Sequence, residues 1–190
     1  MKKNNIFTLF VITLIFILGA VFYTSQNSTK SEFFAVNEKD VIESWDFKGF
    51  YLGNENLEKQ ARSEIEDLKK IKPNENYNEY THNIDLASQY YYLGDGKNAY
   101  KHLIRAIEID PDGTSLAYGN MGSLMRDLGA LETAKDAFEK AYQIQSNGFY
   151  AEKYTNFLKE YFPEELERVI EEERKAAEEA ENLNLLEANI

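Results

Sequence analysis

The sequence predicts an all-α protein whose central part is a short solenoid of helix–turn–helix repeats. The main observation is that residues 80–148 contain one pattern twice, with corresponding residues 35 positions apart. Self-similarity at a period of about 34 residues is typical of helical solenoids, in which each repeat buries its apolar face against its neighbours. The pairs that define the repeat are Gly94 and Gly129, Ala99 and Ala134, Leu103 and Phe138, and Ala106 and Ala141.

Apolar residues inside each copy recur every three to four positions, which is the spacing of a helix with one buried face. Gly94 lies in a turn where glycine tolerates a positive φ angle, and Pro111 ends the helix that precedes it. The copies therefore predict two repeats, at residues 80–113 and 115–148. The helices expected within them cover residues 80–93, 96–109, 115–128 and 131–145.

Two glycines, Gly119 and Gly122, lie inside the first helix expected for the second copy. Each costs roughly 1 kcal/mol of helix propensity relative to alanine. The cost is explained if a neighbouring helix, or the backbone of a ligand, approaches closely at these positions. For Gly122 we expect a neighbouring helix, whereas for Gly119 both explanations stay open.

The two copies closely resemble the tetratricopeptide repeat (TPR) family. The resemblance rests on the small residue of each first helix, Ala87 and Gly122, and on the alanine, large apolar residue and alanine of each second helix. It implies a right-handed solenoid whose first helices line a concave surface. It also implies protein binding as the class of activity, without indicating which protein is bound.

Residues 40–73 contain a weaker copy, which we interpret as a degenerate first TPR. Its second half favours a helix that is capped by an asparagine and ended by a proline. In its first half, residues 47–54 can equally form a short extended stretch and a turn. A loop over residues 74–79 follows. The residues that match the repeat are Trp45, Gly49, Ala61, Ile65, Leu68 and Pro73.

The C-terminal part, residues 149–190, is predicted to consist of capping helices. Residues 149–162 continue as a helix, and Pro163 starts another one that is rich in glutamate. Repeat proteins need such a cap over the exposed end of the solenoid. The alternative is that the acidic helix docks on a partner or self-associates, so a homo-oligomer is possible, although no sequence feature supports one.

The N-terminal part contains an uncharged apolar segment, Ile6–Tyr23. As a helix it is about 27 Å long, which is close to the hydrocarbon thickness of a bilayer. Two lysines precede it, so the positive-inside rule places residues 1–5 in the cytoplasm. We therefore expect one transmembrane signal anchor, a linker over residues 24–39, and an extracytoplasmic TPR domain in the periplasm or on the cell surface.

Two other interpretations of the segment Ile6–Tyr23 remain. It can be a signal peptide that is cleaved after Ala20, in which case the protein is secreted. It can also be a buried core helix, but no polar face interrupts the apolar run. A retained anchor fits the length of the segment and the lack of a clean cleavage site better.

Charge and composition exclude several classes of function. The net charge is -12, and because the three lysines of residues 1–30 face no acid, the remaining chain carries -15. A body this acidic repels a phosphate backbone, so we expect no nucleic-acid binding. The chain has no cysteine, and its two histidines, His82 and His102, do not have the spacing of metal ligands. No catalytic or cofactor-binding motif is present, so we expect no enzyme, no metal and no cofactor.

The TPR resemblance implies a peptide-binding groove along the first helices. Known co-chaperones of the family hold a C-terminal carboxylate in this groove with lysine, asparagine and arginine. Here acidic residues stand beside the asparagine and the arginine, which favours an extended peptide with some positive charge. The alternative is that the groove positions are simply solvated. They map to Asp85, Ser88, Tyr91, Tyr92, Asn120, Ser123, Arg126 and Asp127.

Together these features predict a membrane-tethered, extracytoplasmic TPR module that acts as a scaffold or chaperone-like adaptor for a protein or peptide partner. The arrangement is similar to bacterial inner-membrane TPR proteins that assist the folding or assembly of exported proteins. A second hypothesis is a structural subunit of a permanent cell-envelope complex. An enzyme is the third, and the sequence offers no support for it.

Overall fold

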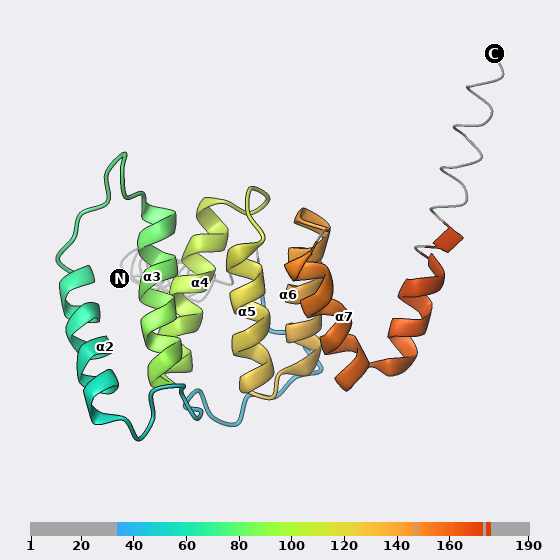
Figure 1. The fold of residues 1–190 in the computed structure, drawn as a ribbon, viewed down its shortest axis with the longest axis horizontal. Helices are drawn as coiled ribbons and strands as arrows, with labels where there is room; N and C mark the ends of the chain where they lie inside the picture. The colour runs from blue at the N-terminus through green and yellow to red at the C-terminus, as the bar shows by residue number, and fades with distance from the viewer. Residues whose placement is uncertain (1–33, 147, 173, 176–190) are drawn as a thin grey trace, which may run out of the picture. The chain divides into compact units, whose positions relative to one another are not determined.

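The computed structural model describes residues 34–146, 148–172 and 174–175. Within these residues the secondary structure is helical, apart from one isolated bridge between Asp46 and Asp95, which confirms the all-α prediction for this part of the chain. Residues 163–172 are helical as well. The labelled helices are α2 (Glu55–Leu68), α3 (Glu79–Leu93), α4 (Gly96–Ile109), α5 (Leu116–Asp127), α6 (Leu131–Ile144) and α7 (Phe149–Tyr161) (Figure 1).

Helices α3 to α6 form the two predicted pairs, and their ends agree with the predicted ends to within one residue. Helix α2 packs on α3, and α7 packs on α6, so the two clear repeats are flanked on both sides. About three repeats are normally needed for a stable solenoid. The flanking helices supply the additional buried surface. The largest fully buried side chains are Leu103, Ile107, Met121, Leu124, Met125, Thr133, Phe138 and Leu158.

Both glycines of α5 allow side chains of this chain to approach closely. A Cβ atom on Gly122 would lie 2.5 Å from Cδ1 of Phe138, and one on Gly119 would lie 2.6 Å from Cε1 of Tyr150. Packing inside the protein therefore explains Gly122, as expected. It also explains Gly119, for which a ligand was the other possibility.

The region of the predicted degenerate repeat contains one helix, α2, instead of two. Residues 45–51 are not helical and lie against the turn between α3 and α4. The backbone N–H of Phe47 donates to the carbonyl of Gly94 (3.1 Å), and the N–H of Gly96 donates to the carbonyl of Trp45 (2.8 Å). A Cβ atom on Gly49 would lie 2.3 Å from the backbone nitrogen of Gly94, so direct contact between the two backbones requires glycine there.

Residues 36–44 continue this non-helical segment to the start of α6. The carboxylate of Asp40 accepts hydrogen bonds from the backbone N–H groups of Glu132 (3.2 Å) and Thr133 (2.6 Å) and from the hydroxyl of Thr133 (2.5 Å). We call residues 36–51 the N-terminal strap, which is the blue segment in Figure 1. It joins the turn of the first repeat to the second helix of the next one.

Several predicted segments fall partly or wholly outside the described residues. The predicted anchor, Ile6–Tyr23, lies wholly outside them, as do residues 1–5, and the linker over residues 24–39 lies partly outside them. Among the helices that the structure describes, none has both the length and the apolar character to cross a membrane. The C-terminal cap is described up to residue 175, without residue 173. There Lys135 of α6 pairs with Glu165 (2.8 Å) and lies 4.4 Å from the ring centre of Phe162.

Candidate functional site

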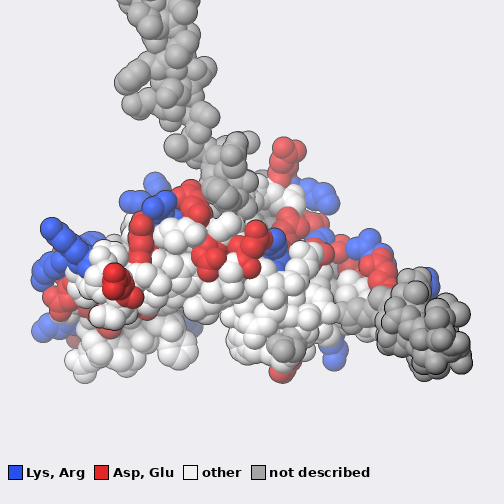
Figure 2. Space-filling view, turned by 90° about the horizontal axis from the view of Figure 1, so that it is seen from above, with Lys and Arg blue, Asp and Glu red and all other residues white. Residues whose placement is uncertain are grey.

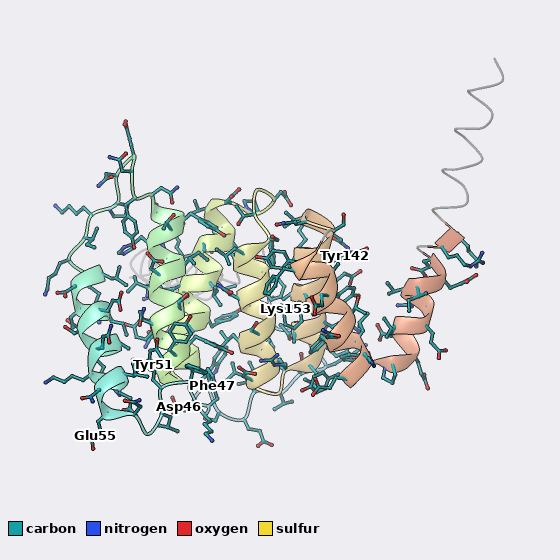
Figure 3. All side chains as sticks on the ribbon, viewed as in Figure 1. Asp46, Phe47, Tyr51, Glu55, Tyr142 and Lys153 are labelled. Carbon is teal, nitrogen blue, oxygen red and sulfur yellow. The ribbon has the colours of Figure 1, made fainter. Side chains whose placement is uncertain are left out.

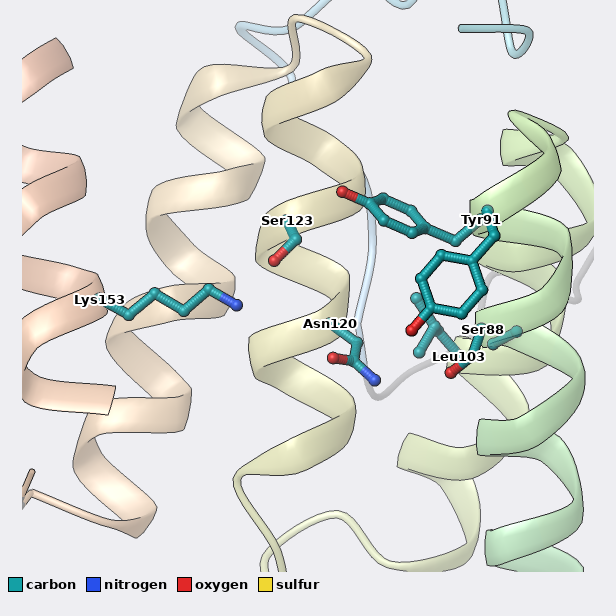
Figure 4. A pocket seen from close by; sticks show the side chains of 8 residues that line it. Ser88, Tyr91, Leu103, Asn120, Ser123 and Lys153 are labelled. Atoms are coloured by element: carbon teal, nitrogen blue, oxygen red, sulfur yellow. The ribbon is translucent and has the colours of Figure 1, made fainter. Parts of the chain in front are cut away.

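A cavity of about 210 Å³ lies among helices α3, α5 and α7, of which α3 and α5 are the first helices of the two repeats (Figure 4). Figure 4 shows Ser88 and Tyr91 on one side, Lys153 on the other, and Asn120 and Ser123 between them. Five of the eight predicted groove residues line this cavity, whereas Asp85, Arg126 and Asp127 do not. The lining residues are Ala87, Ser88, Tyr91, Tyr92, Leu103, Asn120, Ser123 and Lys153.

The two predicted acidic residues already have partners within the protein. Asp85 accepts a hydrogen bond from the hydroxyl of Tyr77 (2.7 Å), in the loop before α3. Asp127 accepts one from the hydroxyl of Tyr91 and pairs with the guanidinium of Arg126 (2.8 Å). Burial, followed by the hydrogen bond to Asp127, raises the pKa of Tyr91, so this tyrosine stays protonated at neutral pH. Arg126 and both carboxylates are thus engaged in contacts within the protein.

The two serines of the cavity are also satisfied locally. The Ser88 hydroxyl donates to the carbonyl of Ile84 (2.9 Å), and the Ser123 hydroxyl donates to the carbonyl of Gly119 (3.0 Å). Such bonds to the carbonyl four residues earlier keep a hydroxyl against its own helix. The serines therefore provide space in the cavity and a hydroxyl oxygen that still accepts a hydrogen bond.

Three groups in the cavity have unused hydrogen-bonding capacity. Within the described part of the chain, the side-chain amide of Asn120 and the hydroxyl of Tyr92 have no hydrogen-bond partner. The ammonium group of Lys153 makes one long contact, of 3.4 Å, to the carbonyl of Gly119. A carboxamide both donates and accepts, and an ammonium group donates three bonds. The cavity therefore offers donors and acceptors to a polar ligand.

Lys153 is half-buried on α7 and forms no ion pair with a carboxylate among the described residues. Its ammonium nitrogen lies 5.4 Å from the ring centre of Phe138 and 5.3 Å from that of Phe149. Burial lowers the pKa of Lys153, and the nearby positive charge of Arg126 acts in the same direction. A ligand oxygen that accepts a hydrogen bond from this nitrogen would offset the free-energy cost of burying its charge.

Sequence reasoning missed Lys153 as a groove residue. The helix over residues 149–162 was predicted as part of the C-terminal capping helices, so the groove positions were not extended into it. Lys153 follows Asn120 by 33 residues, close to the repeat period, and that spacing was the signal for it.

The structure also changes the electrostatic expectation for the groove. The predicted preference for a positively charged peptide depended on Asp85 and Asp127, which are paired within the protein. The cavity itself contains one charged side chain, Lys153. In Figure 2, charged side chains gather along one edge of the molecule, and the opposite edge in that view is mostly uncharged. A segment with polar acceptor groups suits this surface better than a basic one.

The two histidines lie near each other in the first repeat and away from this cavity. Nδ1 of His102 is 2.9 Å from the amide oxygen of Asn83, and its ring stacks on Tyr90. Burial lowers the pKa of His102 to about 4, with the charge of Lys101 acting in the same direction. Within the described ranges, no three His, Cys, Asp or Glu side chains are grouped so that they can hold a metal ion.

Comparison with known proteins agrees with the geometry of the helix pairs. Residues 79–147 match the family model described as tetratricopeptide repeat. No curated protein and no solved structure matches the chain. The matched residues cover α3 to α6, the same helices that carry the sequence repeat. This part of the chain is therefore similar to tetratricopeptide repeats, which generally mediate protein–protein interaction.

Proposed function

We propose that the protein binds an extended segment of another protein in the cavity among α3, α5 and α7. The observation that carries this proposal is that Asn120, Tyr92 and Lys153, which all have unused hydrogen-bonding capacity, line one cavity. An extended segment exposes a donor and an acceptor at nearly every residue, because no secondary structure uses them. The amide of Asn120 can bond both kinds of group, and Lys153 can bond a carbonyl or a carboxylate.

The apolar part of the lining supports the same proposal. Ala87 and Leu103 form the wall of the cavity on the side of the first repeat, and both are buried. Tyrosine contributes a large rigid surface at a small cost in conformational entropy, which is why it is common in peptide-binding sites. A cavity with apolar walls and a few polar groups fits a peptide side chain together with its backbone.

We further propose that Ile6–Tyr23 tethers this domain to a membrane, with the domain on the extracytoplasmic side. The support is the uncharged length of that segment and the two lysines before it. A tethered binding domain would act as a scaffold or chaperone-like adaptor at the cell envelope. A reporter fused to the C-terminus tests the topology: activity that requires an extracytoplasmic location is expected, and activity restricted to the cytoplasm would overturn this part.

Photo-crosslinking in intact cells tests the binding site. A photoreactive phenylalanine analogue replaces Tyr92 in the full chain, and in a control it replaces Lys101, which is exposed on α4. Adducts with another protein are expected from position 92 and should be absent or much weaker from position 101. Equal adducts from both positions, or none from position 92, would refute binding in the cavity.

A further inference from the structure

The N-terminal strap carries aromatic side chains to the edge of the candidate cavity. The ring centre of Tyr51 lies 5.0 Å from that of Tyr92, and the ring centre of Phe50 lies 5.8 Å from Tyr51 and 6.4 Å from Tyr92. We call these three residues the aromatic platform. Tyr92 also lines the cavity, so the platform and the cavity are continuous. Figure 3 shows Tyr51 and Phe47 near the C-terminal end of α3.

The platform is held in place by the backbone. The N–H of Tyr51 donates to the carbonyl of Tyr92 (3.0 Å), which fixes the strap against α3. The N–H of Leu52 donates to the carbonyl of Gly49 (3.1 Å), and that of Asn54 donates to the carbonyl of Tyr51 (2.9 Å). These turn bonds orient the platform before any ligand arrives, so binding there costs little ordering.

Phe50 is 81 % exposed although it is a large apolar residue. Its ring is tilted by 58° to Tyr51 and by 56° to Tyr92, and these tilted contacts leave most of the ring uncovered. No residue of the platform is charged. Aromatic rings pack favourably against further rings in tilted or offset arrangements.

We propose that the binding groove continues onto the strap, where the aromatic platform holds an aromatic side chain of the bound segment. This inference rests on the proposed function, because the same segment is the one that bonds Asn120 in the cavity. An extended chain advances about 3.3 Å per residue, so the aromatic residue lies within a few positions of the residues in the cavity. The partner is thus an extended segment with a Phe, Tyr or Trp, and not one recognised by its charge alone.

The strap supplies two of the three residues of the aromatic platform. These two, Phe50 and Tyr51, lie outside residues 79–147, the part that matches the repeat family. The role of the strap in binding is therefore separate from the role of the repeat helices, and the two can be tested by separate substitutions.

The test begins with a displayed library of random ten-residue peptides, selected on the full-length protein in detergent. One selected peptide that contains an aromatic residue is then synthesised, together with its analogue in which alanine replaces that residue. Affinities of both peptides are measured for the wild type, for Phe50→Ser and for Val41→Ser. Val41 is the matched control, because it is an equally exposed apolar residue of the strap, at 79 %, without a ring contact.

The expected result is a loss of at least fivefold in affinity for the aromatic peptide in Phe50→Ser and no change in Val41→Ser. The alanine analogue should bind wild type and Phe50→Ser equally. Equal binding of the aromatic peptide to wild type and Phe50→Ser would overturn the inference, as would selection of peptides without aromatic residues. If the wild type selects no peptide at all, the proposed function fails and the inference fails with it. Matching thermal unfolding curves exclude misfolding, which is not expected at so exposed a position.

Discussion

The second helices of the two repeats begin in different ways. In the first repeat, Asp95 precedes α4, and its carboxylate accepts a hydrogen bond from the backbone N–H of Asn98 (3.1 Å). In the second repeat, Ala130 occupies the corresponding position and has no side chain that can accept one. The carboxylate comes instead from Asp40 of the strap, 93 residues before Thr133. The hydrogen bond that caps the second helix thus joins residues close in sequence in the first repeat and residues far apart in the second. The second repeat therefore depends on the strap.

The buried pairs between first and second helices differ as well. The first repeat has Ala87 and Leu103 where the second has Gly122 and Phe138. The larger side chain is accompanied by the smaller partner, so the combined volume is nearly conserved. Protein cores are packed closely enough for such a difference to matter.

The largest effect is expected from Gly122→Ala, which breaks this volume match. The new Cβ would lie 2.5 Å from Phe138, whose side chain is 1 % exposed and has no room to move. We expect a loss of about 1–3 kcal/mol in the free energy of unfolding from overpacking. This loss outweighs the helix-propensity gain of roughly 1 kcal/mol that alanine brings. Urea denaturation measures the difference.

The double variant Gly122→Ala/Phe138→Leu sharpens the comparison, because it gives the second repeat the same alanine and leucine that the first repeat has at positions 87 and 103. It should be more stable than Gly122→Ala alone, even though Phe138→Leu by itself destabilises. If Gly122→Ala is as stable as the wild type, the close contact between α5 and α6 is not as described.

A smaller effect is expected from Asp40→Ala, which removes the long-range cap of α6. We predict a loss of about 1 kcal/mol, the typical contribution of an N-cap carboxylate. Asp95→Ala, which removes the local cap of α4, should cost a similar amount. Glu38→Ala is the control, because Glu38 is an exposed strap residue. Equal stability of Asp40→Ala and Glu38→Ala in thermal unfolding would show that the strap does not stabilise the second repeat.

The last effect concerns pH and is absent at neutral pH. It belongs to the first repeat alone, because Ala137 occupies the position that corresponds to His102. The pKa of His102 is lowered from 6.5 to about 4 in the folded protein. Between these values the unfolded chain binds a proton that the folded protein does not. The contribution of His102 to the free energy of unfolding is therefore complete above pH 6.5. It falls as the pH decreases from 6.5 to 4 and stays constant below pH 4.

The difference in melting temperature between the wild type and His102→Gln isolates this effect from the many carboxylates. As the pH falls from 6.5 to 4, the melting temperature of the wild type should decrease relative to that of His102→Gln. A difference that stays constant over this range would show that the folded pKa of His102 is not lowered.

The helix pairs could be predicted from the sequence because their signals are local. The Gly94 turn, the apolar spacing and the recurrence at 35 residues each depend on residues near one another in the chain. The strap could not be predicted in the same way, since its hydrogen bonds join residues such as Trp45 and Gly96, which are far apart in sequence. For residues 47–54 the sequence left two conformations open, a repeat helix or an extended stretch with a turn. The structure has the second one.

The candidate cavity was predicted in part for a similar reason. The resemblance to the TPR family identified Ser88, Tyr92 and Asn120, because their positions on the first helices face the groove in that family, and these residues line the cavity. It could not show that Asp127 pairs with Arg126 and accepts a hydrogen bond from Tyr91, which requires knowing which side chains meet. The charge of the cavity therefore differs from the expectation, although its location does not.

The central claim is that the cavity among the first helices, and not the face of the second helices, binds an extended segment. The most direct measurement is the affinity of a peptide selected on the wild type for the variants Asn120→Ala and Lys101→Ala. Loss of hydrogen bonds to the Asn120 amide should weaken binding roughly tenfold, which corresponds to about 1.4 kcal/mol. Lys101→Ala should leave the affinity unchanged. Unchanged affinity in Asn120→Ala, or an equal loss in both variants, would contradict the account.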